Sequence, residues 1–425
     1  MATAIRDKKG RPIVAVTGIG VVTSLGVGKA DNWAKLTGGV SGIRRISRFP
    51  TDGLRTTIAG AVDEAYRDAM SPAELSERIA LLAGDEAIAE AGIGTKGHFP
   101  GPLYLAPPPL EVEWTERIKM AEMAASNADT GYPEILRVAR EFASTNGEFK
   151  FAIIGERLAE HFGTEGSPVS LNTACASGAS AIQLGMEAIR RGECEAALAI
   201  GADASLTPES LVRFSLLSAL STQNDPPERA SKPFSKNRDG FVLAEGAAAL
   251  VLENFDHARA RGARVLGILE GYGEKSDSFH RTRTSPDGKP IIATMRNALA
   301  DAGIGPEDVD YINAHGTSTP ENDKMEHLGV AAVFGERIRG IPISSNKSMI
   351  GHTLTAAGAV EAAFTLLTLQ NQRLPPTINH AIPDPAIQLD VVPNVARDAK
   401  VRRAMSNSFG FGGQNVCLVM ALEPA

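Results

Sequence analysis

The feature that most limits the fold of this chain is a pattern that occurs twice: a short strand, a polar turn with a reactive side chain, and a helix rich in alanine and glycine. In the first copy, Cys175 follows the strand 168–171. In the second copy, the strand 341–345 leads through His352 into a helix over 356–363. Helices with so few bulky side chains pack closely. We therefore expect the two helices to lie against each other, within two similar α/β halves.

Cys175 is predicted to lie where a buried strand turns sharply into a helix. Such a turn lifts a side chain out of the path of the backbone, as in the nucleophile elbows of hydrolases. Unpaired N–H groups and the positive end of the helix dipole then favour the thiolate. The alternative is a small core residue, because free cysteines are usually buried and inert. The stretch alone leaves both interpretations open.

Composition limits the class of protein. The 425 residues, 43% hydrophobic and 22% charged, can bury a large core in two or three domains. Cys175, Cys194 and Cys417 show no CxxC spacing, which argues against disulfides and a zinc site and favours a reducing compartment. A formal net charge of −7 offers no general attraction to nucleic acid, and no apolar run approaches the length of a membrane span. We therefore expect a soluble cytoplasmic protein without nucleic-acid or membrane partners.

A dinucleotide-binding turn is rejected near the N-terminus. The strand 12–17 is followed by Gly18 and Gly20, but Thr23 stands where the GxGxxG motif requires glycine. A tight turn after the strand explains both glycines.

Residues 97–150 show the least regular pattern in the chain. Three prolines at 107–109 interrupt any helix or strand there. Two surface helices with mixed charge are predicted beyond them, over 114–125 and 132–143.

Two histidines occupy turns that could face a cavity. His315 ends the strand 309–315, and His352 lies between Gly351 and Thr353. A cysteine and two histidines in such turns fit acyl transfer through a thioester, in which the cysteine attacks the acyl donor and the imidazoles donate hydrogen bonds or move protons. The other histidines are interpreted as core or surface residues: His98, His161, His257, His280, His327 and His380.

The chain carries an ordered series of motifs, and the pattern they belong to covers residues 12–60 and 165–423. They are Cys175, the run His-Gly-Thr-Ser-Thr-Pro at 315–320, Lys347-x-x-x-Gly351-His352, the run Ser-Asn-Ser-Phe-Gly-Phe-Gly-Gly at 406–413, and the shorter runs 221–222, 238–241 and 245–246. Together they make the chain resemble the β-ketoacyl-acyl-carrier-protein synthases, most of all the elongating type II condensing enzymes. Thiolases, which use a second cysteine, and chain-initiating synthases, which use Cys-His-Asn, do not fit the two histidines.

The resemblance implies the thiolase fold, a duplicated α/β core of five α-β-α-β-α layers, usually in a homodimer. It implies an N-terminal half, 1–258, that carries the nucleophilic cysteine, and a C-terminal half, 259–425, that carries both catalytic histidines. The implied activity is that of an acyltransferase of fatty-acid biosynthesis. It condenses an acyl thioester with malonyl-acyl-carrier-protein and releases carbon dioxide.

The resemblance also implies roles for single residues. Cys175 would take the acyl chain from the acyl carrier protein. His315 and His352 would assist decarboxylation of the malonyl carrier and stabilise the enolate oxygen. Lys347 would be an electrostatic support, held by Glu326.

Further roles follow from the same resemblance. The backbone N–H groups of Cys175 and Phe411 would form the oxyanion hole, and the Phe411 ring would gate the acyl cavity. Thr317 and Thr319 would contact the phosphopantetheine arm, which arrives on the carrier, so no other organic cofactor is expected. A structural sodium or potassium ion would be surrounded by Asn313, Glu361, Ser406 and Asn407.

Some positions depart from the family pattern. Residues 97–150 lack the phenylalanine-rich segment that usually lines the dimer interface, and Thr355 stands where glycine is common. Our hypothesis is a synthase dedicated to a specialised carrier and very long acyl chains, with ordinary drift in a housekeeping enzyme as the alternative. A polyketide-type ketosynthase or a partner subunit also stays open, because the condensation chemistry is shared.

Overall fold

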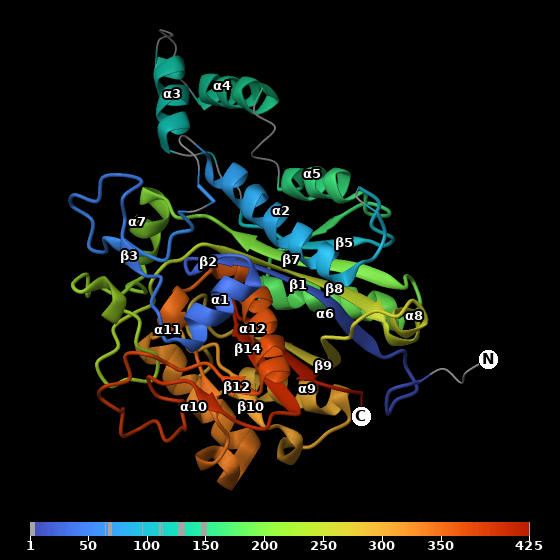
Figure 1. Ribbon diagram of the computed structural model, residues 1–425. Helices are drawn as coiled ribbons and strands as arrows, with labels where there is room; N and C mark the ends of the chain where they lie inside the picture. The colour runs from blue at the N-terminus through green and yellow to red at the C-terminus, as the bar shows by residue number, and fades with distance from the viewer. Residues whose placement is uncertain are drawn as a thin grey trace.

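The structure, a computed structural model, describes residues 5–63, 65–66, 70–95, 97–109, 112, 114–125, 132–145 and 151–424. A mixed sheet of 11 strands runs through both halves of the chain (Figure 1). In spatial order its strands are β11 (Ile343–Ser344), β10 (Tyr311–Asn313), β14 (Arg403–Phe409), β15 (Gln414–Ala421), β9 (Gly267–Ser276), β1 (Val14–Thr23), β8 (Gly246–Asn254), β7 (Ala196–Asp203), β5 (Leu103–Ala106) and β6 (Val169–Ser170), with β2 (Gly26–Val27) paired to β1.

The two halves repeat one arrangement, which confirms the predicted duplication. In the first half, β1, β8 and β7 pair antiparallel in that order, and β7, β5 and β6 continue in parallel. In the second half, β9, β15, β14, β10 and β11 follow the same order and directions. The connecting helices correspond as well: α2 (Pro72–Ala91), α5 (Ile153–Phe162) and α6 (Ser177–Arg190) in the first half, and α9 (Lys289–Ala302), α10 (Pro320–Phe334) and α12 (Ala357–Asn371) in the second.

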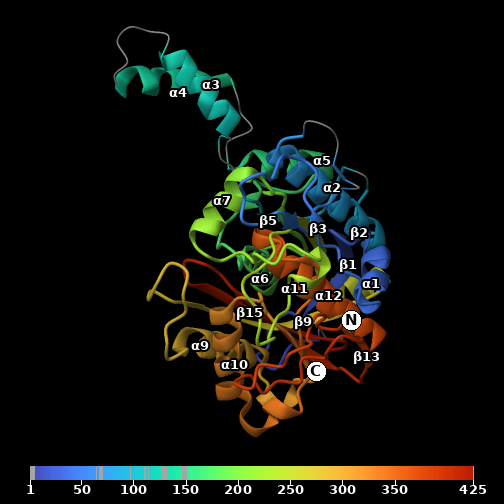
Figure 2. The ribbon, with the colours of Figure 1, turned by 90° about the vertical axis from the view of Figure 1, so that its left-hand side faces the viewer.

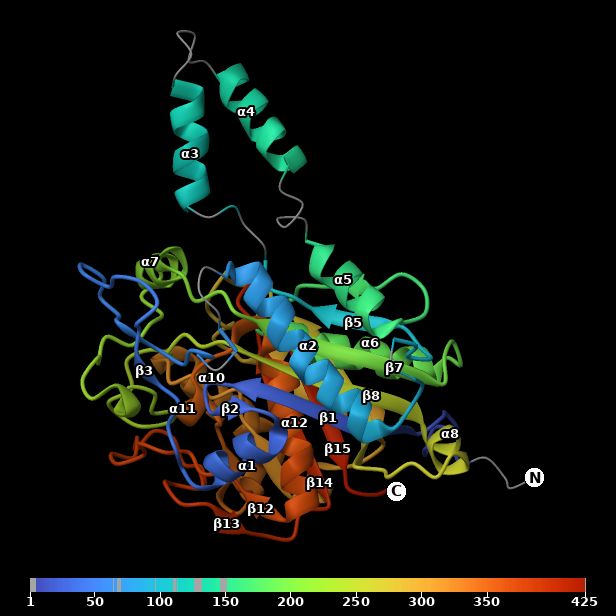
Figure 3. The same ribbon diagram turned by 45° about the horizontal axis from the view of Figure 1, so that its top comes forward.

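These elements form the five expected layers (Figures 1 and 3). α6 and α12 lie together at the centre and pack against strands of both halves. On the outer faces, α2 packs on β1, β8 and β7 with α5 beside it, and α9 packs on β9 and β15 with α10 beside it. The two half-sheets are joined, because β1 also pairs with β9, with Val14 opposite Leu269.

The predicted boundary after residue 258 falls within α8 (Phe255–Ala260), the short helix between β8 and β9. That position separates the two repeats along the chain. The division into halves at 1–258 and 259–425 stays a prediction, because strands of both halves belong to one sheet.

The contact between α6 and α12 depends on two glycines. A Cβ atom on Gly178 of α6 would lie 2.5 Å from the backbone nitrogen of Ala359, and one on Gly358 of α12 would lie 2.5 Å from the backbone nitrogen of Ala179. Real Cβ atoms do not approach backbone this closely, so the helices meet backbone to backbone. The close packing predicted from their small side chains is confirmed.

Two expectations about strands were wrong. We expected a turn at Gly18 and Gly20, but both lie inside β1, which continues to Thr23. Their missing side chains let α2 approach the sheet, since a Cβ atom on Gly18 would lie 2.0 Å from the carbonyl oxygen of Ala87. The strand before Cys175 is also not buried, because β6 is the last strand of the sheet and Val169 is 40% exposed.

Both surface helices predicted between residues 97 and 150 are present. α3 (Trp114–Ala125) and α4 (Tyr132–Thr145) pack on each other and stand away from the five layers (Figures 1, 2 and 3). Ser71 caps α2 through a capping box with Glu74. Among the residues that the structure describes, no helix is both long and apolar enough to cross a membrane.

The shorter elements connect these layers. They are α1 (Lys29–Thr37), β3 (Arg44–Arg45), β4 (Ile58–Ala59), α7 (Pro208–Leu216), α11 (Lys347–Ile350), β12 (Arg373–Leu374), β13 (Arg397–Asp398), and the 3-10 helices η2 (Pro227–Arg229), η3 (Pro306–Asp308), η4 (Gly335–Arg339) and η5 (Leu354–Ala356).

A methyl group at the α6–α12 contact should destabilise the whole protein. We expect Gly358→Ala to lower the free energy of unfolding by about 1–3 kcal/mol, because the backbones must separate. Gly340→Ala is the control, since a Cβ atom there would be 3.9 Å from its nearest neighbour, the carbonyl oxygen of Arg337. Urea denaturation checks both variants, and equal stabilities would contradict the proposed contact.

Candidate active site

Three reactive side chains from separate segments meet at the edge of the central layer. Cys175 lies between β6 and α6, His315 follows β10, and His352 lies between α11 and α12. One nitrogen of each histidine and the Cys175 sulfur all lie within 4.8 Å of one another, and all three residues are buried. The sequence predicted these three residues as one constellation, and the structure brings them together.

The turn before α6 holds Cys175 in place. Ala174 has a φ of 50°, in the left-handed region that side chains other than glycine rarely adopt. The Ser177 hydroxyl stabilises this turn, because it accepts the Thr173 N–H at 2.8 Å and donates to the Ala174 carbonyl at 2.6 Å. The sharp turn predicted for Cys175 is therefore present.

The expectation that the turn favours a thiolate was wrong for the free protein. Burial raises the pKa of the Cys175 thiol, and this effect outweighs the Phe411 backbone N–H and the Lys347 charge, which both lower that pKa. Burial has this effect because it removes the water that would solvate the anion. In the absence of substrate, Cys175 is therefore a neutral thiol at neutral pH.

Both histidines are neutral, and the hydrogen-bond pattern assigns the same tautomer to each. His352 Nδ1 accepts the Leu354 backbone N–H at 3.2 Å, and His315 Nδ1 accepts from Lys347 Nζ at 3.4 Å. Burial, together with the positive charge of Lys347, lowers the pKa of each imidazole well below 6.5. Each ring therefore carries its proton on Nε2 and can donate it as a hydrogen bond without being charged.

The two rings also have a fixed orientation. Their centroids are 5.4 Å apart and their planes cross at 85°. The Phe409 ring contacts His315 edge-on at 5.8 Å, and the Phe241 ring contacts His352 edge-on at 5.2 Å. These aromatic contacts leave the imidazoles little freedom to rotate.

Lys347 supports the site, but its acidic partner is not the predicted one. Its ammonium forms a buried ion pair with Glu361 of α12 and donates to the His315 carbonyl oxygen at 2.6 Å. Glu326, which we expected to hold Lys347, instead accepts the backbone N–H groups of His315 at 2.9 Å and Gly316 at 2.7 Å. Glu326 therefore positions the His315 turn directly, while Glu361 neutralises the lysine.

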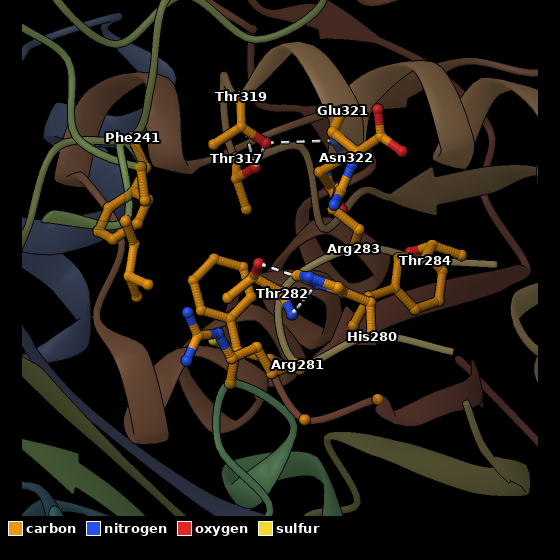
Figure 4. Close-up of a pocket in the computed structure, with 18 of the residues that line it drawn as sticks. Phe241, His280, Arg281, Thr282, Arg283, Thr284, Thr317, Thr319, Glu321 and Asn322 are labelled. Atoms are coloured by element: carbon orange, nitrogen blue, oxygen red, sulfur yellow. Dashed lines mark hydrogen bonds between the residues drawn. The ribbon is translucent and has the colours of Figure 1, made fainter. Parts of the chain in front are cut away.

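A cavity of 480 Å³ opens from these three side chains. Figure 4 shows other side chains of its wall. Thr317 and Thr319, predicted to contact the phosphopantetheine arm, line one side of it, with their hydroxyl oxygens 2.9 Å apart. Phe411, the predicted gate, also lines the cavity, and its backbone N–H approaches the Cys175 thiol. The geometry thus places these predicted residues around one cavity.

Sequence analysis missed the segment 277–284, which forms the opposite side of the cavity in Figure 4. The Arg281 carbonyl accepts the Gly412 N–H at 2.7 Å, and the Asp277 N–H donates to the Gly413 carbonyl at 2.8 Å. The segment therefore braces the glycine-rich turn that carries Phe411. It is polar and shows no periodicity, so no signal in the sequence pointed to it.

Thr355 stands where glycine is common in the family, and its side chain has a structural role here. Its hydroxyl donates to the buried carboxylate of Asp203 at 2.7 Å, and its backbone N–H donates to the same oxygen at 3.2 Å. Asp203 ends β7. The pair therefore ties the His352 turn to the first half of the chain.

The four residues predicted to surround a cation carry unsatisfied oxygens. Asn313 and Ser406 are opposite each other in the β10–β14 ladder. Among the described residues, no partner is found for four buried oxygens of the set: Asn313 Oδ1, Glu361 Oε2, Ser406 Oγ and Asn407 Oδ1. Oxygen donors of this kind suit a hard cation, and buried polar atoms are normally satisfied. The residues present therefore fit a sodium or potassium ion, which stays a prediction.

Family models match both halves of the chain. The model described as "Beta-ketoacyl synthase, N-terminal domain" matches residues 12–258, and "Beta-ketoacyl synthase, C-terminal domain" matches residues 266–381. The chain is 36% identical over 424 residues to a curated 3-oxoacyl-[acyl-carrier-protein] synthase 2 of Coxiella burnetii, covering 96% of this chain and 98% of the relative. It is also 36% identical over 409 residues to the "Putative polyketide beta-ketoacyl synthase 1" of Streptomyces cyaneus, covering 94% and 96%.

Solved structures agree with these relatives. One is a type II PKS acyl-carrier protein in complex with its ketosynthase bound to the hexaketide, with a TM-score of 0.84, 32% identity, and coverage of 97% of this chain and 100% of that chain. Another is a β-ketoacyl synthase from Burkholderia phymatum, with a TM-score of 0.81, 31% identity, and the same coverage. The expected thiolase fold is confirmed.

The protonation state of Cys175 can be tested by alkylation. We expect the rate of iodoacetamide labelling at Cys175 to keep rising with pH beyond 9.0, because burial raises the pKa of the thiol above that ordinary value. Peptide mass spectrometry measures the rate in a Cys194→Ala background. A rate that levels off below about pH 8 would indicate a stabilised thiolate and contradict the expectation.

Proposed function

The chain belongs to the β-ketoacyl synthase family, and on that premise we propose how its residues condense two acyl thioesters. It is an elongating β-ketoacyl-acyl-carrier-protein synthase, an acyltransferase whose partner is the acyl carrier protein. The observation that carries the residue roles is the buried cluster of Cys175, His315 and His352, with reactive atoms within 4.8 Å of one another.

In the first step, Cys175 takes the acyl chain. The Cys175 sulfur attacks the thioester carbon, a new C–S bond forms, and the bond to the phosphopantetheine sulfur breaks. The proton of the Cys175 thiol passes to the departing pantetheine sulfur, so the exchange is balanced. The backbone N–H groups of Cys175 and Phe411 stabilise the oxyanion, a role supported by the approach of the Phe411 N–H to the Cys175 thiol.

In the second step, the malonyl carrier loses carbon dioxide. The electron pair of the broken C–C bond forms an enolate, whose oxygen accepts the Nε2–H groups of His315 and His352. The enolate carbon then attacks the acyl carbon on Cys175. The Cys175 sulfur leaves, and it takes up one proton from solvent, which restores the thiol. Neutral imidazoles suit this role, because they stabilise the anion without transferring their protons.

Lys347 and Glu326 are positioning residues in this scheme. Burial keeps both imidazoles neutral, the Lys347 charge adds to this effect, and Lys347 also binds the His315 carbonyl oxygen, while Glu326 accepts the His315 backbone N–H. Thr317 and Thr319 would bind the phosphopantetheine arm at the cavity wall.

The chain's own cofactor requirement is small. Phosphopantetheine arrives on the carrier, and a sodium or potassium ion would be held by Asn313, Glu361, Ser406 and Asn407. Such an ion supplies a fixed charge that satisfies the buried oxygens of these residues. A homodimer and a cytoplasmic location remain predictions; the three free cysteines support a reducing compartment.

The nucleophile can be identified by intact mass. We expect an acyl adduct after mixing wild-type protein with acyl-carriers of several chain lengths, and none on Cys175→Ala. Cys194→Ala is the matched control and should keep the adduct, because Cys194 does not line the catalytic cavity. Equal adducts on wild type and Cys175→Ala would reject Cys175 as the nucleophile.

The histidine roles predict a pH profile for decarboxylation. The active form of each imidazole is neutral, and its pKa is lowered well below 6.5, so protonation should remove activity only below that pH. We therefore expect the decarboxylation rate of malonyl-carrier to stay constant from neutral pH through about pH 6.5.

Substitution checks the same role. His352→Ala should lower the decarboxylation rate by about 10²-fold or more, because one donor to the enolate is lost. His161→Ala, on the outer helix α5, should leave the rate unchanged.

For the pH profile, a loss of half the wild-type decarboxylation rate at pH 6.5 or above would contradict the expectation, because the imidazoles would then titrate as ordinary exposed histidines.

A further inference from the structure

A second cavity of 300 Å³ adjoins the catalytic one. Phe214, Leu217 and Leu354 line both cavities, so they form the wall that the two share. The Phe214 ring also contacts the Phe241 ring edge-on at 5.3 Å, beside His352. An acyl chain bound to Cys175 that passes these apolar side chains therefore enters the second cavity.

The second cavity is not purely apolar. Glu209, in the first turn of α7, lines it and is only 8% exposed. Its Oε1 atom is buried and has no hydrogen-bond partner among the residues that the structure describes. A buried carboxylate oxygen without a partner is costly, so it requires an explanation.

Two neighbouring hydroxyl groups in this wall donate to other acceptors within the protein. Ser205 donates its hydroxyl to Asp203 at 2.6 Å, and the Thr207 hydroxyl donates to Ser210 Oγ at 3.1 Å. These bonds direct the hydroxyl protons of Ser205 and Thr207 to acceptors other than Glu209. Pro108 and Pro109 cover the same cavity with apolar surface, which strengthens any hydrogen bond formed there.

Helix electrostatics alone do not account for Glu209. An acidic residue in a first turn is favoured by the helix dipole, but this effect does not require burial. Glu156 holds the same kind of position in α5 and is exposed. Burial against a cavity is therefore a separate property of Glu209.

A carboxylate only accepts hydrogen bonds, so its missing partner must carry an O–H or N–H group. We propose that this enzyme selects acyl chains that carry a hydroxyl or amino group, and that Glu209 is the residue that determines this specificity. The inference rests on the proposed function, because the chain reaches the second cavity only from Cys175. The proposed substrates are thus acyl chains with a polar group rather than simple alkyl chains.

Competitive loading of Cys175 tests the proposal without depending on a carrier protein. The probes are acyl-pantetheine thioesters in matched sets of increasing length, ending in a methyl, hydroxyl or amino group. In each loading reaction the Cys175 thiol gains the acyl group and free pantetheine thiol is released. Intact mass gives the ratio of adducts from an equimolar pair.

We expect wild type to prefer the hydroxyl or amino chain over the methyl chain by about tenfold or more at the length that reaches Glu209. Glu209→Leu should reverse the preference. Glu209→Gln, which keeps the size and one acceptor oxygen, should retain much of the preference for a hydroxyl and lose that for an amino group, which separates the two donors. Glu156→Gln is the matched control and should behave as wild type.

The outcomes also separate this inference from the proposed function. If methyl chains load as well as the others and Glu209→Leu does not change the ratio, Glu209 is structural and the inference fails, while the adduct itself upholds Cys175 as the nucleophile. If no chain forms an adduct, the proposed function fails and this inference fails with it.

Discussion

The backbone contact between α6 and α12 is the constraint on which the rest of the structure depends. Each helix begins just after a turn that carries a reactive group, Cys175 before α6 and His352 before α12. Because Gly178 and Gly358 allow the two backbones to touch, the positions of both turns are fixed by the same contact. A protein whose central helices were separated by larger side chains would hold its nucleophile and its enolate donors farther apart. Packing density at the centre thus determines catalytic geometry at the edge.

Charge in the site is arranged so that the reacting groups themselves stay neutral. Burial lowers the pKa of both imidazoles, and the charge of the buried Lys347, which is paired with Glu361, lowers it further. Burial raises the pKa of the Cys175 thiol. A neutral thiol and neutral imidazoles can be kept in a water-poor cavity at little electrostatic cost, and charge develops there only when substrate is present.

Sequence reasoning succeeded where a residue's role follows from its local setting. Cys175, His315 and His352 stand in short turns between regular elements, and the alanine and glycine around Gly178 and Gly358 indicate close helix packing without knowledge of the fold. It failed where two distant residues compete for one partner. Glu326 and Glu361 are both buried acids close to the site, and only their positions in space decide that Glu361 pairs with Lys347. The polar segment 277–284 and the burial of Glu209 depend on the packing of remote segments in the same way.

The pairing of β1 with β9 has a consequence for how the protein unfolds. Each repeat taken alone has an open strand edge, and the two edges pair with each other over Val14–Val16 and Gly267–Leu269. Neither repeat therefore has a fully paired sheet without the other. We therefore expect the two repeats to unfold together, because loss of order in one exposes the hydrogen-bonding edge of the other.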